Sequence, residues 1–410
     1  MSERVESETA SQSTMPPNRS RLRLLVRGAC FAAAVAALWL VAAGVNSSGW
    51  FGSLSPFVAV SSVIAAKAFH TFAWLGLAVG AIVFVRHRLF CRWVCPVGLC
   101  ADGASAIGRR LGRRPMGRFS IGRWIVWLTL GGALLGYPFL LWLDPLAIFA
   151  GTTSAAKNPF EVAMWLPVAG LVAIVVLSVT RPGLWCGRIC PLGAFQDMLS
   201  ALRRSLHHLA RGKENSRAAG ETNLRLGRRA VLGLSVGAAC ALVTKPSRAA
   251  ATLSIRPPGA QDESLFTGLC TRCGNCVGAC PSGIIERDMG QSGWAGLLTP
   301  VLSFDKDYCR EDCVRCTEVC PSGALGRLAL EDKGEMRLGL PVVDMNVCLL
   351  GEDRDCSACK RWCPYDAIRY VFSEVEYALK PVIDVEKCTG CGACEAACPT
   401  KPRKAIVVQA

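Results

Sequence analysis

Sixteen of the 23 cysteines lie in four short clusters between residues 270 and 398, and each cluster ends in Cys-Pro. The first and fourth clusters have the spacing C-x2-C-x2-C-x3-C-P, whereas the second has a gap of three and the third a gap of seven after its first cysteine. Such spacing lets a short loop wrap several thiolates around one small volume. The sixteen are Cys270, Cys273, Cys276, Cys280, Cys309, Cys313, Cys316, Cys320, Cys348, Cys356, Cys359, Cys363, Cys388, Cys391, Cys394 and Cys398.

The spacing predicts [4Fe–4S] clusters, because it matches the run with which bacterial ferredoxins ligate them. Zinc sites commonly include His ligands, but residues 253–410 contain no His. A disulfide framework would not repeat C-x3-C-P four times. Covalent c-type haem requires His directly after C-x2-C, which does not occur here. We therefore expect the sixteen thiolates to hold four [4Fe–4S] clusters.

Residues 253–410 are predicted to form an α+β ferredoxin-like domain with two paired cluster modules. Regular motifs at both ends suggest a nested arrangement, in which the first motif pairs with the fourth and the second with the third. Cys280 would then ligate the cluster of the fourth motif, and Cys398 that of the first. The β-prone stretches at residues 341–344 and 381–385 fit short strands of such a domain.

The net charge of +15 is unevenly divided along the chain. Residues 1–248 hold 28 basic and 9 acidic residues, whereas residues 249–410 hold 18 basic and 22 acidic ones. The basic residues lie between apolar runs instead of forming a continuous basic surface. This pattern indicates membrane topology and argues against nucleic acid as a partner.

Four apolar runs approach the roughly 20 residues that a helix needs to cross a ~30 Å hydrocarbon core. They cover approximately Leu24–Val45, Lys67–Val85, Trp124–Leu143 and Ala163–Val179. We therefore expect a four-helix membrane domain at residues 24–210. The Ser-, Thr- and Glu-rich residues 1–23 are predicted to be a disordered cytoplasmic tail.

Arginines predict the orientation of this domain. Nine of them lie in the segment 86–123 against one acid, Asp102, and more follow the fourth run, while the loops 46–66 and 144–162 carry almost no positive charge. By the positive-inside rule, the N-terminus, the segment 86–123 and the segment after residue 180 face the cytoplasm. The chain is thus expected to be a multi-pass protein of the bacterial inner membrane.

A twin-arginine segment occupies part of the predicted linker, residues 211–252. Arg228 and Arg229 precede a short apolar stretch to Val243, and small residues follow up to Ala251. This is the layout of an export signal of the Tat type. It would place residues 253–410 in the periplasm, either tethered by a fifth span or released by cleavage near Ala251. The alternative is a linker helix on the membrane surface.

Two further motifs lie in the membrane half and are near copies of each other. Cys91-x3-Cys95-Pro and Cys186-x3-Cys190-Pro each follow an even-numbered apolar run, so this half is an internal repeat of about 95 residues. Together they supply four thiolates. We expect a shared site, either iron–sulfur or another thiolate-bound metal. The alternatives are a redox-active dithiol and cysteines that only pack.

Few polar residues are available for other chemistry at membrane depth. Among the four His, only His70 lies well inside the membrane half, so a haem held by two His is not expected. Asp144, Lys67 and His70 lie on the predicted non-cytoplasmic side and are candidates for a quinone site, because ionisable residues at this depth are often functional. Asp144 could equally cap a helix before Pro145.

With these residues in place, the chain resembles NapH-like and NapG-like proteins joined end to end, over about residues 24–405. NapH-like proteins have four spans and two C-x3-C-P motifs, matched here by Cys91/Cys95 and Cys186/Cys190. NapG-like proteins have a twin-arginine signal and four cubane motifs. The stretch C-S-A-C-K-R-W-C-P at residues 356–364 also looks like that of NapG and of the methylamine-utilisation ferredoxins (MauM).

The resemblance implies a quinol dehydrogenase type of protein in the membrane. Electrons from membrane quinol would pass through four [4Fe–4S] clusters to a periplasmic reductase or cytochrome. One alternative is an electron-donating maturation factor for a metalloenzyme, because NosR-like proteins share the C-x3-C-P pattern. A redox sensor or anchor is another. Motif likeness locates clusters better than it identifies function.

Overall fold

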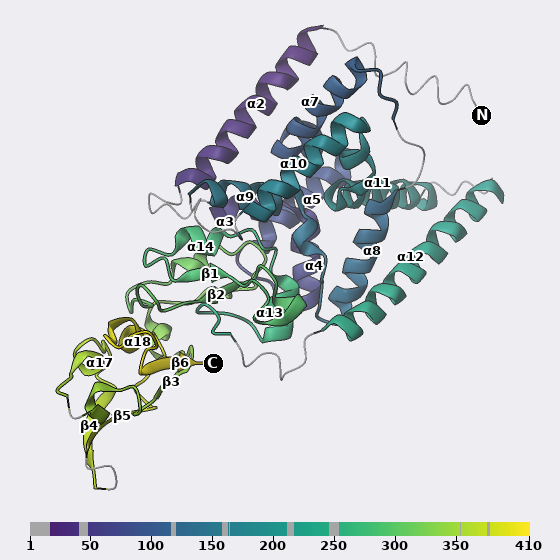
Figure 1. Ribbon diagram of the computed structural model, residues 1–410. Helices are drawn as coiled ribbons and strands as arrows, with labels where there is room; N and C mark the ends of the chain where they lie inside the picture. Colours follow the sequence, from purple (N-terminus) through teal and green to yellow (C-terminus); the bar gives the residue numbers. More distant parts are fainter. Residues whose placement is uncertain are drawn as a thin grey trace.

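The structure is a computed structural model in which a helical part, residues 17–245, carries an α+β part, residues 254–410, against one end (Figure 1). The predictions for the first sixteen residues and for cleavage near Ala251 lie outside the described residues. The described residues are 17–40, 48–115, 120–157, 163, 165–210, 217–245, 254–352, 354–374 and 378–410.

The helical part contains the internal repeat. Each copy is a short apolar helix, a second apolar helix, a turn with the two cysteines and an amphipathic helix. The last helix of each copy packs on the second apolar helix of the other copy. The first copy comprises α4 (Pro56–Ala66), α5 (Ala73–Val85), α6 (Leu89–Trp93) and α7 (Pro96–Arg110), and the second α9 (Pro145–Lys157), α10 (Trp165–Thr180), η4 (Trp185–Ile189) and α11 (Pro191–Ala210).

The two copies meet at the N-termini of their first helices. Ser55 caps α4 and Pro56 follows at its first position, while Asp144 and Pro145 occupy the same places at α9. The Ser55 hydroxyl donates a hydrogen bond of 2.7 Å to Asp144 Oδ1. The capping interpretation of Asp144 is therefore confirmed, since its other oxygen accepts the Leu146 N–H at 3.0 Å.

Two helices in the described part of the chain are long and apolar enough to cross a membrane, judged by length and composition. They cover Arg21–Trp39 within α2 (Pro17–Leu40) and Gly227–Thr244 within α12 (Arg217–Thr244). The other three predicted spans form α5, α8 (Ile121–Leu134) and α10, whose 13, 14 and 16 residues reach only about 20 to 24 Å. The prediction of four full spans is therefore not confirmed.

Two of these helices, α5 and α8, are short because the chain turns sooner than its hydropathy suggests. Lys67 adopts a left-handed conformation after α4, so α5 begins only at Ala73. Gly136 also has a positive φ and ends the stretch after α8, before Pro138 and η2 (Leu141–Leu143). Apolar residues on both sides of each turn give one continuous run in sequence but two elements in space.

The α+β part consists of two modules with the same topology. In each, an inner antiparallel hairpin lies between an outer pair of segments. In the first module β1 (Ile285–Arg287) pairs with β2 (Pro300–Leu302), and Ala260 bridges Leu325 outside them. In the second, β4 (Ile368–Ser373) pairs with β5 (Ala378–Ile383), inside β3 (Leu340–Val343) and β6 (Ile406–Gln409).

Short helices follow the cysteines in both modules, and β3 and β5 confirm the two β-prone stretches seen in the sequence. All named sheets have two antiparallel strands. The remaining elements are α3 (Ser48–Ser53), α13 (Glu263–Leu269), α14 (Asn275–Ala279), α15 (Gly293–Gly296), α16 (Arg315–Glu318), η6 (Glu331–Glu335), η7 (Leu349–Glu352), α17 (Ala358–Arg361) and α18 (Ala393–Ala397).

Candidate metal centres

The sixteen cysteines of the α+β part gather into four groups of four, which we name A to D by distance from the helical part. Groups A and B line separate cavities in the first module. Group D lines a cavity in the second module, and the thiols of group C lie close enough to influence one another's ionisation. The groups are A (Cys270, Cys273, Cys276, Cys320), B (Cys280, Cys309, Cys313, Cys316), C (Cys363, Cys388, Cys391, Cys394) and D (Cys348, Cys356, Cys359, Cys398).

The nested pairing expected from the sequence is wrong. Cys320, the last cysteine of the second motif, completes group A, and Cys280, the last of the first motif, completes group B. Cys398 likewise joins the third motif and not the first. The reason is topological: each module closes its own outer pair of segments around its own hairpin, so consecutive motifs face each other.

The donor sets fit iron–sulfur cubes. All 23 cysteines are free thiols. Burial raises the pKa of Cys270 and of Cys391 to about 11, so these thiols need a nearby positive charge, such as iron, to become ligands. No three His, Cys, Asp or Glu of the described residues converge tightly enough for one metal ion, whereas a cube is held by one thiolate at each of four separate irons.

The last cysteine of each motif completes the group of the neighbouring motif, and we call these four the exchanged cysteines. Backbone amides donate hydrogen bonds to the sulfur atoms of two of them. Leu325 N–H donates to Cys320 Sγ at 3.3 Å, and Ala367 N–H to Cys363 Sγ at 3.3 Å. Burial alone would raise the pKa of Cys398, but hydrogen bonds from the Thr400 hydroxyl and nearby amides lower it below its ordinary value. Hydrogen bonds to sulfur tune the reduction potential of a cluster.

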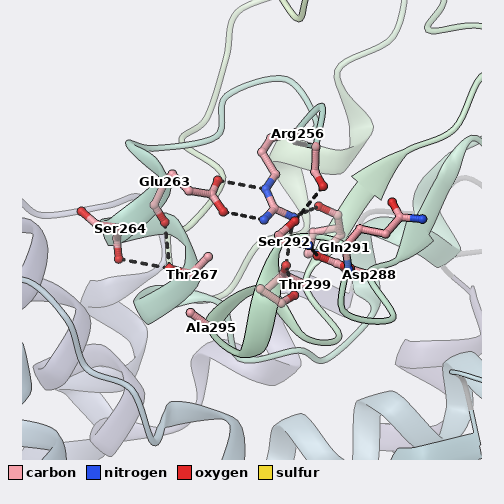
Figure 2. A network of polar contacts seen from close by, with 12 residues as sticks. Arg256, Glu263, Ser264, Thr267, Asp288, Gln291, Ser292, Ala295 and Thr299 are labelled. Atoms are coloured by element: carbon pink, nitrogen blue, oxygen red, sulfur yellow. Dashed lines mark hydrogen bonds and ion pairs between the residues drawn. The ribbon is translucent and has the colours of Figure 1, made fainter. Parts of the chain in front are cut away.

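An ion-pair network holds the first module together (Figure 2). The Arg256 guanidinium donates to both oxygens of Glu263, at 3.0 and 2.5 Å, and to Thr299 Oγ1 at 2.9 Å. Asp288 accepts three backbone amides of the turn after β1, including that of Ser292. The network therefore ties the start of the module to the hairpin beside group A.

Two basic side chains that the sequence analysis overlooked lie beside the thiols. Lys333 is buried, its ammonium group donates to the carbonyl oxygens of Arg310 and Cys313, and its charge opposes the burial that raises the pKa of Cys309. Arg287, at the end of β1, is also buried and lines the cavity of group A. Neither belongs to a recognisable motif, so only the fold reveals them.

The cysteines of the two C-x3-C-P motifs in the helical part lie near one another. The thiols of Cys95 and Cys190 interact electrostatically with those of Cys91 and Cys186. Gly98 and Gly193 amides donate to Cys95 and Cys190 Sγ, at 3.4 and 3.5 Å. Gln196 Nε2 donates to Cys91 Sγ at 3.1 Å across the two repeats.

An ion pair holds the turn before Cys91 in place. Arg88 donates to both oxygens of Asp197 at 2.6 Å each. Asp197 belongs to α11, whereas Arg88 precedes α6, so the pair joins one repeat to the other. The pairing keeps Cys91 next to the second repeat. The four thiols therefore lie near one another at the junction of the repeats.

Asp144, Lys67 and His70 do not form one site. Asp144 lies at the N-terminus of α4, through Ser55, and Lys67 at its C-terminus, so the helix separates them by about 16 Å. Lys67 is exposed, and His70 Nε2 hydrogen-bonds with Ser62 Oγ at 2.8 Å. The prediction failed because residues near the same end of two apolar runs need not share a depth once short helices intervene.

The first module rests directly on the helical part, as Figure 1 shows for α14 beside α9. Ser154 Oγ of α9 donates to Gly274 O, next to Cys273, at 3.4 Å. A Cβ placed on Gly52 would lie 2.8 Å from Pro321, and one on Gly323 would lie 2.9 Å from His70. Group A is therefore the group nearest the helices.

The two modules meet at their thiols. The Cys309 N–H of group B donates to the Cys391 carbonyl of group C at 2.9 Å, and Leu338 N–H donates to Thr389 O at 2.8 Å. Group D lies beyond group C, in the second module, which Figure 1 shows farther from the helices than the first module. The four groups thus follow one another in the order A, B, C, D.

Comparison with known proteins supports iron–sulfur sites in both parts. The family "4Fe-4S dicluster domain" matches residues 269–324 and 354–401, the two modules. The family "4Fe-4S binding domain" matches residues 68–114 and 163–208, the two repeats with C-x3-C-P. No solved structure matches the chain.

Several curated relatives match about two fifths of the chain. The ferredoxin-type protein NapG of Escherichia coli is 37% identical over 174 residues, which are 40% of this chain and 74% of NapG. The methylamine utilization ferredoxin-type protein MauM of Methylobacillus flagellatus is 37% identical over 179 residues, 41% of this chain and 73% of MauM. The ferredoxin-type protein NapF of Escherichia coli is 31% identical over 150 residues, 36% of this chain and 82% of NapF.

These matches confirm the iron–sulfur, ferredoxin-type part of the sequence-based resemblance; they do not extend to a NapH-like membrane half. The identity is 37% in both cases and extends over 74% of NapG and 73% of MauM. The chain therefore belongs to the family of ferredoxin-type iron–sulfur electron-transfer proteins that includes NapG and MauM.

Proposed function

We propose that the protein oxidises membrane quinol and passes the electrons through four [4Fe–4S] clusters to a periplasmic reductase or cytochrome. The observation that carries the proposal is the serial order of the thiol groups, with group A against the helices and group D far from them. Each cluster carries one electron at a time. A series of four divides the two-electron oxidation of quinol into single transfers.

Each of the sixteen cysteines has the same proposed role, which is to ligate the cube of its group A, B, C or D. A fifth thiolate-bound centre is proposed at Cys91, Cys95, Cys186 and Cys190, where the 4Fe-4S binding family matches the chain. Lys67, His70 and Asp144 have no proposed catalytic role, since they are exposed, in contact with the first module, or used as a cap.

We propose that α12 is a membrane span that tethers the modules on the periplasmic side. It packs along α8 through glycines: a Cβ on Gly233 would lie 2.6 Å from Trp127, and one on Gly237 would lie 2.3 Å from Leu128 O. Gly131 of α8 is equally close to Leu234. Small residues four apart let helix backbones approach in membranes. Arg228 and Arg229 then stand near the cytoplasmic end of this span.

The test is anaerobic reduction of the full-length protein in lipid nanodiscs by a menaquinol analogue, followed through the visible absorbance of the clusters. We expect bleaching of the wild type. The control variant Cys320→Ala lacks a ligand of group A, so its clusters should respond to dithionite but not to quinol. If dithionite reduces the wild type and quinol does not, quinol oxidation is wrong. A maturation factor or a redox sensor would then fit better.

A further inference from the structure

A cavity of about 320 Å³ lies between the helical part and the first module. Side chains of η2, α9, α10 and η4 form one wall and are almost all apolar. The other wall consists of Thr271, Arg272, Arg287 and Leu298 of the first module. An apolar cavity with a few polar groups is the usual form of a small-molecule site.

The same four residues of the first module also line the cavity of group A. A single layer of residues therefore separates the two spaces. Thr271 and Arg272 lie between Cys270 and Cys273 in the sequence, so a molecule in the apolar cavity would touch the loop that carries these two thiols.

Two basic residues lie in the shared wall. The Arg272 guanidinium donates to the carbonyl oxygens of Leu297 and Ala295 at 2.7 and 2.9 Å. Arg287 reaches between α9 and the cluster loop: its Nη2 lies 3.8 Å from the place of a Cβ on Gly151 and 2.3 Å from one on Gly274. Glycine at position 274 therefore makes room for this guanidinium.

A polar group also faces the cavity from the helical side. Trp185, directly before Cys186, lines the cavity and is only 6% exposed, and no described residue accepts a hydrogen bond from its Nε1. A buried donor without a partner costs free energy, about 1–3 kcal/mol. A ligand with an oxygen acceptor on an otherwise apolar body would satisfy this donor.

We infer that this cavity is the quinol site, with the head group between Trp185 and Arg287 and the apolar tail along α10. The inference rests on the proposed function and gives it a location. Oxidation breaks the two O–H bonds of the quinol and leaves the quinone. The two protons pass to water at the boundary of the two parts, and two electrons leave one after the other through the thiol-bound centre of group A.

Gly170 of α10 offers a direct test. It lines the cavity, and a Cβ there would touch only Ile148 Cγ2, at 3.9 Å. Gly170→Phe therefore fills the cavity without a clash at the backbone. Val172→Phe is the matched control, because Val172 is on the same helix, is 54% exposed and does not line the cavity.

Two readouts are compared in nanodiscs that contain the full-length protein. The first is the rate of cluster reduction by a menaquinol analogue, with dithionite reduction and iron content as checks on cluster assembly. The second is photolabelling with an azido-menaquinone, mapped by mass spectrometry, which requires no electron transfer. We expect Gly170→Phe to slow quinol reduction at least roughly tenfold and to lose the label from α10, while Val172→Phe matches the wild type.

Arg287→Gln should also slow quinol reduction while the label on α10 persists. If Gly170→Phe is reduced at the wild-type rate and the label maps elsewhere, the location is wrong and the proposed function stands. If quinol does not reduce the wild type, the proposed function fails, and this inference fails with it.

Discussion

The two modules hold their clusters with the same loop but rest that loop on different supports. Gly274 follows Cys273 in the first module and Gly392 follows Cys391 in the second, and both have a positive φ. A Cβ on Gly274 would lie 3.4 Å from Ser154 of α9 in the helical part, whereas one on Gly392 would lie 2.2 Å from Phe304 of the first module. The loop of the first module therefore packs on the helical part, and the same loop of the second module packs on the first module.

The surroundings of the thiols also differ. In the first module Cys270, Cys273, Cys309 and Cys316 are buried, while group D of the second module has no fully buried thiol. Solvent exposure and nearby charge set the reduction potential of a cluster. The same cysteine pattern thus gives buried thiols in group A, beside the helices, and more exposed thiols in group D, away from them.

The largest effect is expected from removing one exchanged cysteine in each module. Cys320→Ala removes a ligand of group A, and Cys398→Ala the corresponding ligand of group D. Each variant should lose one cluster in iron analysis. Quinol should fail to reduce Cys320→Ala but should still reduce the remaining clusters of Cys398→Ala. Equal behaviour of the two variants would contradict the proposed order.

The ion pairs of the two modules should differ in strength. Arg256→Ala leaves the part-buried Glu263 carboxylate, which is 15% exposed, without its partner, and we expect the first module to lose up to about 3–5 kcal/mol. The exposed pair between Arg403 and Asp344 should contribute only about 0–1 kcal/mol. Urea titration of cluster absorbance in Arg256→Ala and Arg403→Ala measures both. A larger loss for Arg403→Ala would reverse the comparison.

The joint between the modules should depend on Gly392. Gly392→Ala forces a Cβ into Phe304 at a positive φ, at an expected cost of about 1–3 kcal/mol. Electron transfer from group B to group C should slow, because the joint must open. Gly278→Ala is the control, since nothing lies within 4 Å of its Cβ. Flash reduction with spectroscopic resolution of the clusters compares them; unchanged kinetics in Gly392→Ala would argue against this joint.

The smallest effect is expected from the charge beside group B. Lys333→Met removes a buried cation next to Cys309 and should lower the reduction potential of that cluster by tens of millivolts, because the reduced cluster carries more negative charge. Lys387→Met, at an exposed position beside Cys388, should shift its cluster less. Redox titration followed by electron paramagnetic resonance measures both shifts. A larger shift in Lys387→Met than in Lys333→Met would contradict the prediction.

The cysteines were the predictable part of this protein. Their spacing identified the three cysteines of each motif that stay in one group, the repeat of C-x3-C-P indicated that its two copies correspond, and β-prone stretches located β3 and β5. The partners of Cys280 and Cys398 could not be predicted, because spacing within a motif contains no information about which outer segments pair. That choice is made by hydrogen bonds far along the chain, between β3 and β6.

The helical part was less predictable for a related reason. Hydropathy adds up apolar residues without regard to the left-handed turn at Lys67 or the positive φ of Gly136. The hydropathy pattern therefore predicted single long spans where the structure has a short helix followed or preceded by a turn. Arg287, Lys333 and Trp185 carry no motif at all, and their importance follows only from which cavities they line or which thiols they adjoin.

The backbone hydrogen bond from Cys309 to Cys391 has a consequence for how such a protein can diversify. Because it is formed by main-chain atoms, no side-chain substitution at either residue removes its donor or acceptor, short of proline. The distance between group B and group C therefore does not depend on side chains at the surface of the second module. Substitutions on that surface can therefore adapt the protein to a new electron acceptor without changing the distance between groups B and C.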